Sequence, residues 1–223
     1  MRSSLPRAVI FDMDGLMLRS EELWSEVDRL VLAEYGRRYD PSRKHLFMGC
    51  EKQESARRFL EVYEIREAPE TIARHRSERV RDLYRQRVEL MPGLEELVAD
   101  LAGWGKALAV ATSAEKAIVE IVQARFEVFR RYQAVVCADD VKRGKPAPDL
   151  FLEAARRLGV PPEAALVLED SPNGVDAALA AGMKVIAVPS PSVRRESLSH
   201  ATLTVEGLTD ISRQTIARVY GSG

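Results

Sequence analysis

The strongest constraint on this fold is an alternation of short apolar runs and amphipathic stretches over the carboxyl-terminal part of the chain. After residue 91, helical stretches alternate with four apolar runs of strand length, at 107–111, 134–137, 165–168 and 185–188. A fifth run, Ala8–Phe11, lies near the amino terminus. Continuously apolar runs that are separated by helices predict a parallel sheet with helices on both sides.

A helical block interrupts this alternation directly after the first apolar run. The patterns predict a helix that begins at Ser20, as its N-cap, and ends near Gly36, and further helices at about 51–63 and 69–88. No convincing strand pattern occurs in this block. We therefore predict an α/β fold in which residues 1–18 and 90–223 form a Rossmann-like parallel-sheet core and residues 19–89 form an inserted α-helical cap domain.

Composition and charge narrow the classes of partner. The chain has 223 residues, of which 46% are hydrophobic and 30% are charged, as in soluble globular proteins. Its formal net charge of −1 gives no overall attraction to nucleic acid or to an anionic membrane. No apolar run approaches the roughly 20 residues of a membrane-spanning helix, and no secretory leader pattern is present. We expect no nucleic-acid or membrane partner, and a monomer or weak dimer.

Cysteine usage indicates a reducing compartment. The two cysteines, Cys50 and Cys137, are far apart, and the sequence has no CxxC motif. This pattern predicts neither a zinc site nor a redox pair, so we interpret both as reduced packing residues and expect a cytoplasmic protein. The three histidines, His45, His75 and His200, match no spacing of metal ligands or of a catalytic triad.

Polar groups follow the predicted strands. Because the carboxyl ends of parallel strands meet at one edge of the sheet, groups that follow different strands become neighbours. A single Asp-x-Asp-Gly motif is weak, since it occurs more often in turns than in catalytic sites, but four such groups at one edge are far more specific. They are Asp12-Met13-Asp14-Gly15, Thr112-Ser113, Gly144-Lys145-Pro146 and Glu169-Asp170-Ser171.

The carboxylates of this set form an all-oxygen site, which suits Mg²⁺. Burying three or four carboxylates without a cation would be costly, and a metal ion together with Lys145 would offset their charge. A calcium loop is excluded, because a loop that starts at Asp12 has Met17 where it requires glycine. The plainer alternative is that Glu169 and Asp170 only cap the next helix.

The motifs FDMDG, ATS, GKPAPD and LEDSPNG occur in this order along the chain. They resemble the haloacid dehalogenase superfamily of phosphohydrolases, in its branch with a helical cap. Within that branch, FDMDGLML, LMPG and LEDSPNGVDAALAAGM are similar to phosphatases of pseudouridine 5′-phosphate and of sugar phosphates. The resemblance covers essentially the whole chain. It implies a Mg²⁺-dependent phosphatase of a small phosphorylated metabolite that works through an aspartyl-phosphate.

The resemblance implies a role for each matching carboxylate. Asp12 would be the nucleophile and also a metal ligand. Asp14 would give its main-chain carbonyl to Mg²⁺, while its side chain would protonate the leaving oxygen and then activate water. Asp170 would be the third metal ligand, with Glu169 either a further ligand or a partner that orients the ligands.

The resemblance also implies which groups bind the substrate. Thr112 and the main chain of Ser113 would hold the phosphoryl oxygens, and Lys145 would neutralise charge between Asp12 and the phosphate. The segment 48–52 resembles the specificity loop of the family, which makes Lys52 a candidate for contact with the far end of the substrate. A solvated lysine at a helix start is an equally good interpretation of Lys52.

Two positions depart from the family pattern. Arg19 stands where the family usually has an acidic residue, and it would either contact the substrate anion or pair with a cap carboxylate such as Glu22. Trp24 stands where the related enzyme β-phosphoglucomutase has a catalytic histidine, which argues against a phosphosugar mutase.

A dehalogenase would need neither a metal nor a second acid, so Asp14 and Asp170 argue against that activity. The non-enzyme alternatives are a phospho-accepting receiver and a family member that only binds.

A run of arginines in the cap raises the question of nucleic-acid binding. Acidic residues are interleaved with these arginines, and no aromatic platform for stacking bases accompanies them. The pattern therefore predicts a solvated cap helix. The arginines are Arg74, Arg76, Arg79, Arg81, Arg85 and Arg87.

Overall fold

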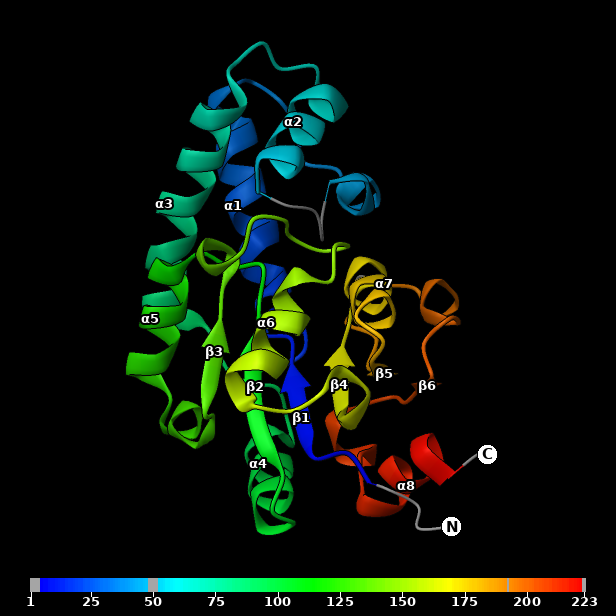
Figure 1. The fold of residues 1–223 in the computed structure, drawn as a ribbon. Coiled ribbons are helices and arrows are strands. Elements are labelled where there is room, and N and C mark those ends of the chain that lie inside the picture. Colours follow the sequence, from blue (N-terminus) through cyan, green and yellow to red (C-terminus); the bar gives the residue numbers. More distant parts are fainter. Residues whose placement is uncertain (1–4, 48–51, 192, 222–223) are drawn as a thin grey trace.

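The computed structural model describes residues 5–47, 52–191 and 193–221. Its centre is a six-stranded sheet in which all neighbouring strands are parallel, in the order β3-β2-β1-β4-β5-β6 (Figure 1). The strands are β1 (Ala8–Phe11), β2 (Ala107–Ala111), β3 (Ala134–Val136), β4 (Ala165–Glu169), β5 (Lys184–Ala187) and β6 (Leu203–Thr204). The parallel-sheet prediction is confirmed.

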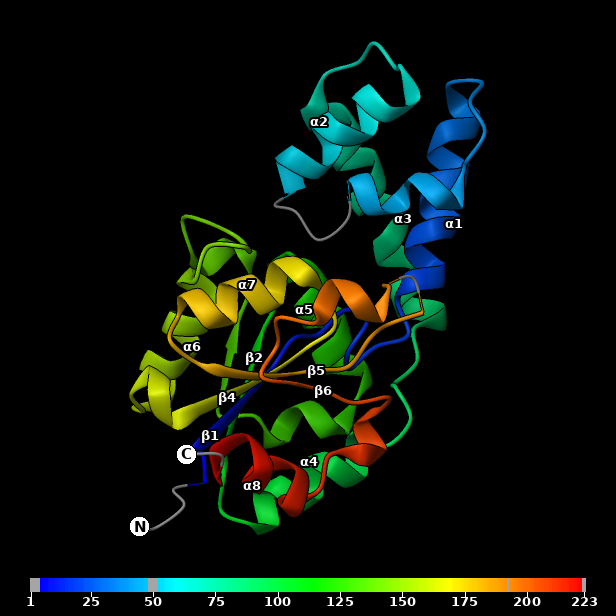
Figure 2. The same cartoon turned by 90° about the vertical axis from the view of Figure 1, so that its right-hand side faces the viewer.

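Helices cover both faces of this sheet (Figure 2). They are α4 (Leu94–Gly103), α5 (Lys116–Arg125), α6 (Asp149–Leu158), α7 (Pro172–Ala180) and α8 (Arg213–Gly221). Val9 and Phe11 of β1 belong to the apolar cluster that includes α4, α5 and α8, whereas Ala8 and Ile10 belong to the cluster with α6 and α7. Both faces of β1 are therefore buried, which explains why its sequence is apolar throughout.

A helical layer lies beyond the carboxyl ends of the strands (Figure 1). It contains α1 (Glu21–Glu34), α2 (Lys52–Tyr63), α3 (Pro69–Arg87) and a short 3₁₀ helix at Pro41–Leu46. This layer has its own aromatic packing, for example the edge-to-face pair of Phe47 and Phe59 with ring centroids 5.2 Å apart. It is also anchored to the core, because α3 packs against α5.

The two segments that join the predicted core to the predicted cap lie side by side. Leu18 forms an antiparallel bridge with Leu90, and the Met91 N–H donates to the Met17 carbonyl at 2.8 Å. The chain thus enters and leaves the helical layer through one short pair of segments. The division into a core of 1–18 and 90–223 and a cap of 19–89 stays a prediction, and this pairing supports it.

Some details differ from the sequence predictions. Neither β6, which has only two residues, nor α8 was predicted. Ser20 occupies the N-cap position of α1, but its side chain makes no capping hydrogen bond. Cys137 is a buried free thiol, as expected, while Cys50 lies outside the described residues. None of the described helices is long and apolar enough to cross a membrane.

Candidate active site

Three predicted residues meet at the carboxyl edge of the two central strands. Asp12 directly follows β1, and Glu169 is the last residue of the neighbouring strand β4. The Lys145 ammonium lies between them: it forms an ion pair with Asp12 Oδ1 and donates to Glu169 Oε1 at 2.5 Å. All three side chains are almost fully buried. The topology therefore joins residues that are up to 157 positions apart (Asp12 to Glu169).

The electrostatics of this cluster show an excess of negative charge. Burial raises the pKa of Asp12 to about 8; Lys145 opposes this shift and Glu169 adds to it. Burial, with Glu169 and Asp12 nearby, raises the pKa of Asp170 well above its usual range. Burial alone would lower the pKa of Lys145, but its two carboxylate partners raise it. One ammonium does not balance three carboxylates, so the cluster favours a further cation.

Both carboxylate oxygens of Glu169 accept hydrogen bonds from protein groups. Its Oε1 accepts from Lys145, and its Oε2 accepts from the main-chain N–H groups of Asp170 and Ser171, each at 2.8 Å, and from the Ser171 hydroxyl at 3.0 Å. A Cβ atom at Gly174 would overlap this carboxylate. Of the two roles considered for Glu169, these contacts favour the partner that orients Lys145 and the start of α7.

The residues fit a hard divalent cation. No group of three or more His, Cys, Asp and Glu side chains within the described ranges is arranged as a metal site. The predicted ligand set does not require three such side chains. It combines the carboxylates of Asp12 and Asp170 with the main-chain carbonyl of Asp14. Gly15 has a φ of 85°, and a Cβ there would collide with the Asp170 carboxylate. Asp170 is therefore held directly against the Asp-x-Asp-Gly loop.

Asp14 has a partner that the sequence analysis missed. The hydroxyl of Tyr84, on α3, donates to Asp14 Oδ1 across the interface between the helical layer and the core. Burial raises the pKa of Asp14, while hydrogen bonds from Tyr84 and Ser20 oppose this shift. Ser20, predicted as an N-cap, lies beside Asp14 on the wall of the same cavity. No local motif identifies Tyr84, which is 70 residues from Asp14 in sequence.

Thr112 and Ser113 follow β2 and lie at the same edge. Thr112 is buried, and its Oγ1 accepts from the Ala114 N–H at 3.0 Å, which fixes the side chain while its own O–H is available as a donor. Both residues line a cavity together with Asp12 and Lys145. The placement agrees with the expected role in holding phosphoryl oxygens, which stays a prediction.

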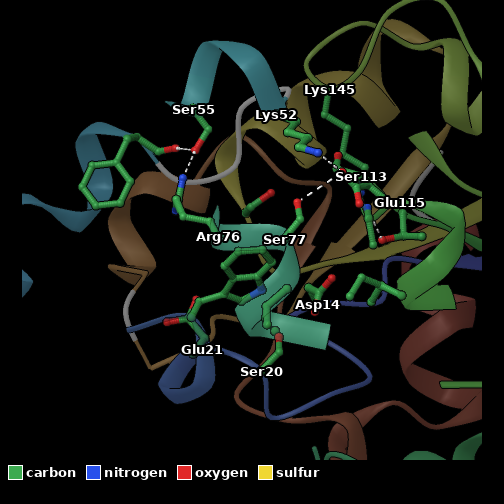
Figure 3. A pocket seen from close by; sticks show the side chains of 18 of the residues that line it. Asp14, Ser20, Glu21, Lys52, Ser55, Arg76, Ser77, Ser113, Glu115 and Lys145 are labelled. Atoms are coloured by element: carbon green, nitrogen blue, oxygen red, sulfur yellow. Dashed lines mark hydrogen bonds and ion pairs between the residues drawn. The ribbon is translucent and has the colours of Figure 1, made fainter. Parts of the chain in front are cut away.

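This cavity has a volume of about 210 Å³ and lies between the strand ends and the helical layer. Figure 3 shows Asp14, Ser113 and Lys145 on its core side and Ser55 and Arg76 on its cap side. Glu115 fastens the two sides: it forms an ion pair with Lys52 and accepts from Arg81 at 3.0 Å. Ser77 also donates to Glu115, at 3.2 Å.

The candidate Lys52 therefore lines the cavity, but Glu115 holds its ammonium. The rest of the resembling segment, residues 48–51, lies outside the described residues. Of the two alternatives for Arg19, the structure shows pairing with a cap carboxylate: Arg19 lies 3.6 Å from Glu89, rather than from Glu22, in an exposed ion pair. Trp24 lines the cavity.

The prediction of a solvated arginine helix is wrong at Arg76. Its guanidinium is buried in the cap and donates through Nε to Asp28 Oδ1 at 2.9 Å. The other arginines of the run are more exposed than Arg76, and they form ion pairs with acidic residues. One example is the exposed pair of Arg74 and Glu78 at 3.4 Å. The interleaved charges thus concealed one inward-facing arginine.

Comparisons with known proteins agree with this arrangement. The family model described as haloacid dehalogenase-like hydrolase matches residues 9–188. A probable pseudouridine-5′-phosphatase of Drosophila melanogaster is 41% identical, over 90% of this chain and 89% of that protein. A fructose-1-phosphate phosphatase of Escherichia coli is 37% identical, over 81% of this chain and 95% of that protein.

A solved structure shares the whole architecture. It is the crystal structure of CbbY from Rhodobacter sphaeroides in complex with phosphate, with a TM-score of 0.81 and 29% identity, covering 92% of this chain and 96% of that one. The family match spans most of the chain, and both of these relatives are named as phosphatases. The chain belongs to the haloacid dehalogenase-like hydrolase family, as an enzyme of its phosphatase branch.

Proposed function

We propose that this enzyme hydrolyses the phosphomonoester of a small metabolite, with Asp12 as the nucleophile. The observation that carries the proposal is the position of Asp12, which directly follows the central strand β1, contacts Lys145 and lines the cavity together with Thr112. Phosphoryl transfer depends mainly on positioning and charge compensation, and this cluster offers both.

The chemistry proceeds in two steps. An Asp12 carboxylate oxygen attacks phosphorus, the bond from phosphorus to the leaving oxygen breaks, and the Asp14 carboxyl gives its proton to that oxygen. Asp14 then takes a proton from water as the water oxygen attacks the phosphorus of the aspartyl-phosphate, which releases inorganic phosphate and restores Asp12. Lys145 and Thr112 stabilise the charge on the phosphoryl oxygens throughout.

The cofactor in this proposal is Mg²⁺. Phosphatases of this family generally use a divalent metal ion. Asp12, the Asp14 carbonyl and Asp170 would hold it, and this all-oxygen set suits Mg²⁺ better than softer ions. When bound, the ion supplies compensation for negative charge on the phosphate and on the buried carboxylates.

The proposed substrate is a sugar phosphate or a nucleoside monophosphate. The similar proteins are named for pseudouridine 5′-phosphate and for fructose 1-phosphate, which share a phosphomonoester on a hydroxylated carbon skeleton. A phosphosugar mutase is the alternative, and Trp24 argues against it, since an indole cannot relay a proton.

We also propose a cytoplasmic location for the enzyme, on the evidence of its cysteine usage.

A phosphate-release screen tests this function. Purified protein with Mg²⁺ is supplied with pseudouridine 5′-phosphate, uridine 5′-phosphate, fructose 1-phosphate, glycerol 3-phosphate and phosphoglycolate. Asp12→Asn is the paired variant, and it should lower the rate by more than about 1,000-fold while leaving the fold intact, because the amide is not a nucleophile. Activity of that variant within tenfold of wild type would contradict the assignment.

A further inference from the structure

A buried carboxylate oxygen lies at the cap end of the cavity. Asp28, on α1, is 1% exposed and lines the cavity. Its Oδ1 accepts from Arg76 Nε at 2.9 Å. Its Oδ2 is buried and has no hydrogen-bond partner within the part of the chain that the structure describes. Buried polar atoms are nearly always paired in folded proteins, so an unpaired oxygen on a cavity wall indicates a place for a ligand.

The arginine that holds Asp28 is itself immobilised. Arg76 Nη1 donates to the Ser55 hydroxyl at 3.2 Å, a contact that Figure 3 shows at the cap side of the cavity. Its guanidinium carbon lies 4.9 Å from the centre of the Phe59 ring and 5.6 Å from the centres of the Trp24 and Phe47 rings. Three aromatic faces and two hydrogen bonds fix the guanidinium, so Asp28 keeps its direction when a ligand enters.

The chemistry of this end differs from that of the core end. Asp28 and Arg76 neutralise each other, so the pair does not attract a second phosphate or a carboxylate as an isolated arginine would. The unsatisfied atom is an acceptor, and it therefore requires a donor. A hydroxyl or an N–H group satisfies it, whereas an alkyl chain or an anionic oxygen leaves it unpaired.

We propose that Asp28 Oδ2 selects the substrate by accepting a hydrogen bond from a hydroxyl or N–H group of the leaving portion. The inference rests on the proposed function, which places the phosphate at Asp12 and so directs the rest of the molecule toward the cap. A cavity of about 210 Å³ suits a small phosphorylated polyol or a similar compact metabolite. Discrimination by hydrogen bonding to a buried acceptor is strong, because an analogue without the donor leaves that acceptor desolvated.

Matched pairs of substrates test the proposed hydrogen bond to Asp28 on the wild-type enzyme. Glycerol 3-phosphate is compared with propyl phosphate, which differs from it only in lacking two hydroxyl groups. Fructose 1-phosphate is compared with hexyl phosphate, which lacks its hydroxyl groups and also its C2 carbonyl or ring. Wild-type kcat/KM should favour the better hydroxylated partner by about 10- to 100-fold. Pseudouridine 5′-phosphate against ribose 5-phosphate separates a base N–H from a sugar hydroxyl as the donor. Preferences below threefold in all pairs would overturn the proposal.

A single-atom change supplies the second test. In Asp28→Asn the amide oxygen can still accept from Arg76 while the NH₂ group replaces the unpaired oxygen, so a donor faces a donor. The wild-type preference for the favoured partner should fall about 10- to 100-fold in this variant. Glu34→Gln is the control, because Glu34 also lies on α1 and pairs with Arg79 but does not line the cavity. It should keep the preference.

The outcomes distinguish a failure of the proposed phosphatase function from a failure of the proposed role of Asp28. If wild type releases phosphate from no phosphomonoester, the proposed function fails first. If it hydrolyses hydroxylated and alkyl phosphates equally well, or if Asp28→Asn retains the wild-type preference, the function stands and the role of Asp28 is refuted. Melting curves check that Asp28→Asn folds; if it does not, the substrate pairs on wild type decide alone.

Discussion

Gly174→Ala is predicted to damage the active site through a residue that never touches substrate. Gly174 lies in the first turn of α7, where alanine is ordinarily the better helix former. A Cβ at this position, however, would occupy the space of the Glu169 carboxylate, which is completely buried. Either Glu169 or the start of α7 must then move. In both cases the 2.5 Å contact between Glu169 and Lys145 is lost or lengthened.

The two effects have opposite signs, and their magnitudes decide the result. Replacing glycine by alanine inside a helix stabilises by about 0.5–1 kcal/mol. Breaking a buried ion pair by displacing one partner costs about 3–5 kcal/mol, because the remaining charge stays buried without compensation. The net expectation is a destabilisation of about 2–4 kcal/mol. For a chain of this size that lowers the melting temperature by roughly 5–15 °C.

Thermal melts and phosphate release measure the two consequences separately. Gly174→Ala should melt lower than wild type and lose most of its kcat, since Lys145 is no longer fixed between two carboxylates. Gly103→Ala is the matched control, because a Cβ at the end of α4 meets no atom within 4 Å. It should change stability by less than about 1 kcal/mol. A Gly174→Ala protein as stable and as active as wild type would refute the steric argument.

The remaining predictions concern the metal and the phosphoryl acceptor. Treatment with EDTA should abolish phosphate release and Mg²⁺ should restore it, whereas Ca²⁺, which is larger and less exacting in geometry, should not; full activity in metal-free protein would contradict the ligand set. With a hexose 1-phosphate as substrate, free phosphate should form faster than isomerised sugar phosphate, because Trp24 cannot act as an acid or base. Faster isomerisation would assign the enzyme to the mutases.

The core architecture was predictable because its signals are local and repeated. Each central strand is apolar throughout and ends in a polar group, so the sheet and its functional edge follow from the pattern alone. The meeting of Asp12 and Glu169 was predictable for the same reason, since β1 and β4 are parallel neighbours in the sheet, whereas Lys145 reaches them from the loop after β3. The positions of Gly15 and Gly174 follow from the close approach of carboxylates to the main chain.

The cap side of the cavity was not predictable, because its contacts are tertiary and its signals are ambiguous. Arg76 is one of six arginines between residues 74 and 87, and composition does not distinguish the buried one from the exposed ones. Its partner Asp28 is one of five acidic residues in the amphipathic helix α1. The sequence alone suggests only a packing role for Tyr84. The packing of α3 on the core brings its hydroxyl to Asp14.

One helix connects recognition to chemistry. Arg76, Val80 and Tyr84 are four residues apart on α3 and therefore lie on one stripe about 12 Å long. Arg76 holds Asp28 at the far end of the cavity, Val80 lines it, and Tyr84 holds Asp14 at the reacting end. Glu115 clamps the same helix to the core through Ser77 and Arg81. Because these contacts share a rigid element, an opening of the cap would withdraw the substrate pocket and the Asp14 partner together.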